Sequence, residues 1–110
     1  MSIKDLVSVL PEKHIYEIAK NNIEYIDFDY ISKHKKLSEE FIEKYKDYVN
    51  WNYISERQNL SESFIEKHKD RVDWIRISIN QKLSEPFIEK YKNYVNWNYI
   101  SERQNLSESF

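Results

Sequence analysis

The chain has 110 residues, with 17 Lys and Arg against 19 Asp and Glu, and it contains no Cys, no Gly and two Pro. The length suits one domain with a sizeable core. Without Cys there are no disulfides or thiolate metal sites, and without Gly there are no phosphate-cradling Gly-rich loops. The net charge of −2 gives no electrostatic reason to expect nucleic acid or an anionic membrane as partner. No membrane-spanning apolar run and no secretory signal pattern occur, so we expect a cytoplasmic, intracellular protein.

Residues 1–22 are predicted to form an N-terminal helical cap. Ser2 is a helix-capping residue type and begins a short helix that runs to about Val9. Pro11 then opens a longer helix to about Asn21. This segment departs from the periodicity of the rest of the chain, as the terminal repeats of repeat proteins often do.

From residue 14 onward the chain repeats with a period of 23 residues. The three Trp stand at 51, 74 and 97, and LSE triplets begin at 37, 60, 83 and 106 with the same step. A fixed period of this length is typical of repeat architectures. The tandem repeats cover residues 14–110 as one continuous domain, divided into a degenerate copy at 14–36, full copies at 37–59, 60–82 and 83–105, and a partial copy at 106–110.

Each repeat is predicted to contain two short helices, the first of about nine residues and the second of about seven. Ser38 has the chemistry of a helix N-cap, and Leu37 and Ile42 flank it at the spacing of a hydrophobic staple. The second helix repeats this arrangement behind Asn50 or its equivalents. Helices this short are unstable alone and must stack on neighbours. The sequence therefore predicts an all-α fold, a short α-solenoid of two-helix 23-residue repeats; leucine-rich repeat and coiled-coil spacings do not fit.

The run from Leu60 to Ser78, of the form LSExFIExxxDxVxWxxIS, resembles a tandem repeat of uncharacterised proteins of low-GC bacteria, their phages and large DNA viruses. The resemblance covers residues 14–110 and is clearest over 37–110. It implies a helical repeat fold and a viral or mobile-element origin. It implies no catalytic residue and no ligand.

The positions of residue types that often act in catalysis or metal binding are explained in this chain by the repeat. His68 occupies a position that holds Tyr in other repeats, so we expect it to pack in the core, and His14 and His34 lack metal-ligand spacing. The carboxylates recur once per repeat, which is typical of solvated helix faces, whereas catalytic pairs are singular. The Trp residues are expected to be core wedges between repeats; a base-stacking platform is the alternative. We therefore expect no enzyme, no cofactor and no metal.

A candidate contact surface lies on the outward side of the second helices. It carries one aromatic or Arg residue per repeat, and these residue types dominate interface hot spots. The repeat 60–82 reads WIRISIN where its neighbours read WNYISER, which places Ile75 and Ile79 on a face that is otherwise polar. They form either a contact patch or a pair buried against the adjacent helix. The candidate contact residues are Tyr30, Tyr53, Arg57, Ile75, Arg76, Ile79, Tyr99 and Arg103.

These features predict a non-enzymatic protein-protein interaction module whose protein partner is not specified by the sequence. One alternative is a phage- or virus-encoded inhibitor of a nucleic-acid-processing defence enzyme. Another is a structural protein that self-assembles, because the last repeat stops at Phe110 and leaves an uncapped C-terminal end for a homo-oligomer. Direct nucleic-acid binding is disfavoured, since the Lys clusters alternate with acids.

Overall fold

The computed structural model describes residues 2–104, and every regular element in that range is helical. The chain divides into two compact units, residues 1–50 and 51–110. Successive helices within the second unit contact one another as in a solenoid, which confirms the predicted all-α repeat fold. The partial repeat 106–110 and the predicted open end at Phe110 lie outside the described residues.

The first unit begins with the predicted cap. Ser2 and Asp5 form a capping box around the first turn of α1, and α2 begins directly after Pro11. Glu12 accepts hydrogen bonds from both the backbone N–H and the hydroxyl of Ser38, so the cap holds the start of the first full repeat. The elements are α1 (Ile3–Ser8), α2 (Glu12–Asn21), the 3₁₀ turn η1 (Ile23–Tyr25), α3 (Phe28–His34) and α4 (Glu39–Lys44).

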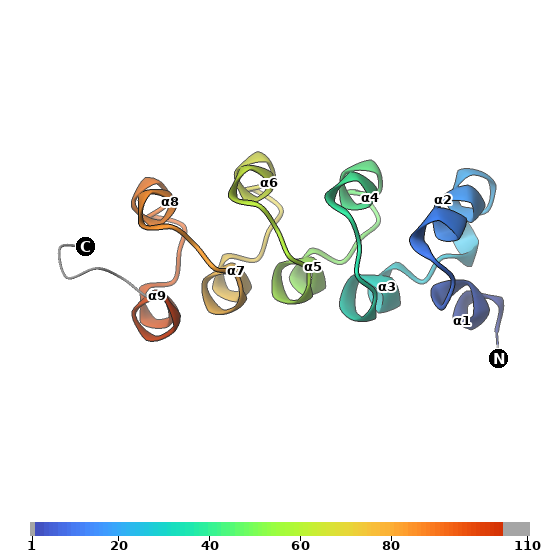
Figure 1. Ribbon diagram of the computed structural model, residues 1–110, viewed down its shortest axis with the longest axis horizontal. Helices are drawn as coiled ribbons and strands as arrows, with labels where there is room; N and C mark the ends of the chain where they lie inside the picture. Colours follow the sequence, from blue (N-terminus) through green and yellow to red (C-terminus); the bar gives the residue numbers. More distant parts are fainter. Residues whose placement is uncertain (1, 105–110) are drawn as a thin grey trace. The chain divides into compact units, whose positions relative to one another are not determined.

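The second unit contains two and a half repeats. The second helices of its repeats, α5, α7 and α9, lie in one row (Figure 1). The first helices of its repeats, α6 and α8, lie in another row. The α5–α7 and α7–α9 pairs pack side by side. The bounds are α5 (Trp51–Arg57), α6 (Glu62–Lys67), α7 (Trp74–Asn80), α8 (Glu85–Lys90) and α9 (Trp97–Arg103).

The predicted caps are present at the helix starts. Ser61 and Ser84 accept the backbone N–H of Phe64 and Phe87, and Asp73 caps α7 in the same way. These bonds satisfy N–H groups that have no partner inside a helix, and each contributes about 1 kcal/mol. The starts of α6, α7 and α8 are therefore each fixed by the residue immediately before the helix.

The first helices are shorter than predicted, with six residues in place of about nine. After Lys44 the backbone tightens, because the carbonyl of Tyr45 accepts the N–H groups of both Tyr48 and Val49. The same double acceptance occurs at His68 and at Tyr91. This turn ends the helix and delivers the next apolar residue, Val49 or its equivalent, to the core.

The core of the second unit is built from the predicted inward positions. Ile65, Ile77, Ile88 and Ile100 are fully buried, and His68 is buried as a packing residue. Burying an Ile side chain contributes roughly 1.5–3 kcal/mol, which stabilises helices that are too short to form alone.

The Trp residues join one repeat to the next. Trp51 packs against Phe64 and His68, and Trp74 packs against Phe87, Tyr91 and Tyr94, all on the first helix and turn of the following repeat. This confirms the wedge prediction for Trp51 and Trp74, which are half-buried against the core. Trp97 is 43% exposed.

Two polar contacts also tie the α6 helix to the α8 helix. Glu62 accepts both the backbone N–H and the hydroxyl of Ser84. Glu66 accepts hydrogen bonds from Lys90 and from the Tyr91 hydroxyl, which lower the pKa of Glu66 and raise the pKa of Tyr91 to about 12. These shifted pKa values have a structural cause, since both groups belong to the link between repeats.

Candidate functional site

The outer face of the α5–α7–α9 row is the candidate site. The helices turn their buried positions, such as Ile54, Ile77 and Ile100, toward the core. A helix places residues three or four apart on one side, so the positions between the buried ones point outward. Because α7 packs against both α5 and α9, the outward residues of three repeats form one continuous surface.

The structure separates the two isoleucines of the predicted patch. Ile75 is 51% exposed, and the neighbouring repeats carry the polar Asn52 and Asn98 at its position. Ile79 is half-buried and lines a pocket against α9. Ile75 therefore faces solvent, whereas Ile79 is partly covered at the edge of this pocket.

Arg76 is engaged within the protein. Its guanidinium pairs with Asp73, the N-cap of its own helix, and with Glu56 of the preceding repeat at 3.6 Å between Nε and Oε2. The hydrogen bond to Asp73 and these two negative charges raise the pKa of Arg76. Arg76 therefore connects α5 to α7 and has less of its donor capacity available to a partner.

The remaining candidate residues of the second unit lie on α5 and α9, the two helices that pack against α7. Tyr53 and Tyr99 are half-buried on α5 and α9, and Arg57 and Arg103 are exposed at the ends of the same helices. Tyr30 belongs to α3 in the first unit, where it is 44% exposed and its ring lies 4.8 Å from that of His34. The candidate site therefore consists only of those residues of the predicted face that belong to the second unit.

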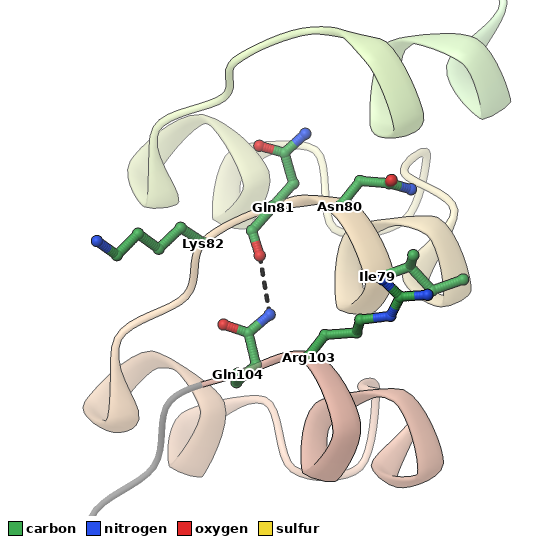
Figure 2. Close-up of a pocket in the computed structure, with 6 residues that line it drawn as sticks. All are labelled: Ile79, Asn80, Gln81, Lys82, Arg103 and Gln104. Carbon is green, nitrogen blue, oxygen red and sulfur yellow. Dashed lines mark hydrogen bonds between the residues drawn. The ribbon is translucent and has the colours of Figure 1, made fainter.

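A pocket of about 260 Å³ opens at the C-terminal ends of α7 and α9. In Figure 2 the Arg103 side chain reaches toward Ile79, whereas the Lys82 side chain extends away from both. The lining residues are Ile79, Asn80, Gln81, Lys82, Arg103 and Gln104.

The wall of this pocket includes a Gln ladder that the sequence analysis did not identify. Gln104 donates through Nε2 to the carbonyls of Ser78 and Gln81, and its Oε1 accepts the N–H of Leu83. Gln81 makes the same three contacts one repeat earlier, to Ser55, Gln58 and Leu60. The signal was present in the sequence, because Gln recurs at 58, 81 and 104 with the repeat period.

Other site types find no support in the described part of the chain. Residues 2–104 contain no group of three or more His, Asp or Glu side chains arranged to hold a metal ion. None of the helices between residues 2 and 104 is both long enough and apolar enough to cross a membrane. Comparison with protein-family models, with curated proteins and with solved structures gave no match to this chain.

Proposed function

We propose that the chain is a non-enzymatic protein-binding module and that its contact surface is the outer face of α5, α7 and α9. The observation that carries the proposal is Ile75, a half-exposed aliphatic side chain at a position where both adjacent repeats have Asn. A single exposed apolar residue is ordinary on a protein surface. Here it lies in a row with the Tyr and Arg residues of the neighbouring helices.

The composition of this surface matches that of interface centres. Tyr and Arg are enriched among hot-spot residues, and an apolar centre with a polar rim is the usual interface layout. Ile75 supplies the apolar centre, and Tyr53 and Tyr99 flank it. Glu56 and Glu102 place negative charge on the same helices, which favours a protein partner over nucleic acid.

Buried residues and hydrogen bonds of α7 also keep this surface rigid. Ile77, on the opposite side of α7 from Ile75, is fully buried, and so is Ser78. Ser78 donates to the carbonyl of Trp74 and accepts the N–H of Asn96 at the start of α9. A contact surface that is already ordered loses less conformational entropy on binding.

The proposal can be tested with random dodecapeptides displayed on phage and selected against the folded chain. Affinities of the selected peptides are then compared for the wild type, Ile75→Asp and the matched control Asn98→Asp, which places the same charge at the equivalent position of α9. Loss of a hot-spot residue costs about 2 kcal/mol or more, so Ile75→Asp should weaken binding ~30-fold. The control should change it by less than about threefold. Ile75 is in the first turn of α7, where an acid is tolerated, so far-UV circular dichroism should be unchanged.

Two results would contradict the proposal. Selected peptides that bind Ile75→Asp as tightly as the wild type would show that this face is not the contact surface. A solution mass that rises with concentration for the wild type, and stays at 13.6 kDa for Ile75→Asp, would show that the face joins copies of this chain instead.

A further inference from the structure

The pocket between α7 and α9 differs in chemistry from the equivalent place one repeat earlier. The 23-residue register maps the lining residues Ile79, Asn80, Lys82 and Arg103 onto Glu56, Arg57, Asn59 and Asn80. The α5–α7 step thus carries one acid and one cation, whose charges cancel, whereas the α7–α9 step carries an aliphatic side chain and two cations. The backbone arrangement repeats, so the difference lies in the side chains alone.

Arg103 is the cation that the pocket places best. It is exposed, and within residues 2–104 it makes no ion pair, whereas Arg76 on the neighbouring helix is paired with two acids. Its side chain extends toward Ile79 in Figure 2, and both residues line the pocket. A guanidinium beside an apolar wall is less hydrated than one in open water, and it binds a carboxylate through two parallel hydrogen bonds.

The acid closest in sequence, Glu102, is not part of the lining. Glu102 corresponds to Glu56, which pairs with both Arg57 and Arg76. Within residues 2–104 no such ion pair joins Glu102 to Arg103, so the positive charge of Arg103 is uncompensated on the pocket side.

One effect opposes an anion at this place. The pocket lies at the C-terminal end of α7, where backbone carbonyls carry partial negative charge. Two of these carbonyls, on Ser78 and Gln81, already accept hydrogen bonds from Gln104 at 3.2 and 2.9 Å. The end of a short helix carries only a partial charge, which solvent screens at a surface. The guanidinium of Arg103 carries a full charge and can hold a carboxylate through two parallel hydrogen bonds, so its attraction prevails.

The pocket size selects the kind of ligand. Pockets for cofactors and drug-sized molecules enclose about 300–1,000 Å³, and they bury most of the ligand. This pocket measures about 260 Å³. It therefore suits one or two amino-acid side chains of a larger partner.

We infer that the pocket receives a carboxylate side chain, Asp or Glu, of a partner polypeptide, with a neighbouring apolar residue of that polypeptide against Ile79. The carboxylate pairs with Arg103, and Lys82 adds positive charge at the rim. This inference rests on the proposed function and specifies the partner as an acidic–apolar segment.

The test is a double-mutant cycle on peptides selected from the same dodecapeptide library at low and at physiological salt. We expect the selected peptides to carry Asp or Glu within two positions of a large apolar residue. Replacing that acid by its amide should weaken binding to the wild type about tenfold and should have no further effect on Arg103→Gln. Lys92→Gln, which removes one positive charge from an exposed position after α8 and outside the α5–α7–α9 face, should weaken binding less than twofold.

A second variant tests whether a loss of binding comes from the pocket residues and not from misfolding. The triple change Ile79→Glu, Lys82→Asn and Arg103→Asn installs the residues that the α5–α7 step already carries, so the fold should tolerate it. It should abolish the preference for acidic peptides.

Loss of binding in Ile75→Asp but not in Arg103→Gln would overturn the pocket inference and leave the proposed function standing. The inference is also wrong if the selected peptides show no enrichment in acids. It is equally wrong if the acid-to-amide change in the peptide and Arg103→Gln in the protein weaken binding additively. Binding that survives both Ile75→Asp and Arg103→Gln, or a selection that yields no binding peptide, would overturn both.

Discussion

Replacing Gln81 by Ala should destabilise the second unit by about 3 kcal/mol. Gln81 is 7% exposed, and its amide lies between α5 and α7. Nε2 donates to the carbonyls of Ser55 and Gln58 at 2.9 and 2.7 Å, and Oε1 accepts the N–H of Leu60 at 3.2 Å. The Gln81 side chain therefore supplies a hydrogen-bond partner to three backbone groups that have none within a regular helix.

The magnitude follows from these three bonds. A hydrogen bond in a folded protein contributes about 1 kcal/mol net, and a buried backbone group left without a partner costs ~1–3 kcal/mol. Three lost bonds give roughly 3 kcal/mol, with some relief where water enters the space left by the side chain. Total stabilities of about 5–15 kcal/mol make this a large fraction. Gln81→Glu should be at least as damaging at neutral pH, because a carboxylate cannot donate to either carbonyl.

Urea denaturation followed by far-UV circular dichroism measures the free energy of unfolding. Lys82→Ala is the control, since this exposed neighbour should shift stability by less than about 0.5 kcal/mol. A cost below 1 kcal/mol for Gln81→Ala would refute the view that the Gln ladder couples the repeats.

Two further predictions concern the tyrosines that share one repeat position. The Tyr45 hydroxyl is buried without a hydrogen-bond partner among the described residues, so Tyr45→Phe should leave stability unchanged or raise it by up to ~1 kcal/mol; thermal denaturation that shows a clear loss would contradict this. Tyr91 donates to Glu66, and its pKa is raised from 10.0 to about 12. The folded state then holds the phenolic proton more tightly, so wild-type stability should fall as pH rises from about 10 toward 12, and Tyr91→Phe should flatten this slope; equal slopes for both proteins would refute the assignment.

The helix caps and the buried positions could be predicted because their causes are local. Ser61 and Phe64 are three residues apart, so the cap bond is implied by the chain itself. The spacing of Ile77 and Ser78 from Trp74 likewise places them on the inward side of a helix, and both are fully buried. The length of the first helices was overestimated, because the turn that ends them uses backbone groups of any residue type.

The candidate site was predictable as a face but not in detail. The break in the repeat at 74–80 identified Ile75 and Ile79 in advance. The exposure of Ile75 and that of Ile79 differ because each depends on the side chains of the adjacent helix. The ion pair between Arg76 and Glu56, 20 positions earlier in the chain, likewise depends on how the helices pack. The pocket and the Gln ladder escaped prediction because the joined groups lie 21–26 positions apart, as from Leu60 to Gln81 and from Ser55 to Gln81.

The short capped helices with one buried side, repeated every 23 residues, follow from the amino-acid sequence alone. Those properties arise from the chemistry of residues within one or two helical turns of each other. How one repeat is joined to the next depends instead on the packing of the folded chain. Ser55 holds the start of α7, Gln81 binds carbonyls of the preceding repeat, and Ile79 and Arg103 line one pocket. These arrangements depend on which groups of successive repeats are brought together when the helices pack.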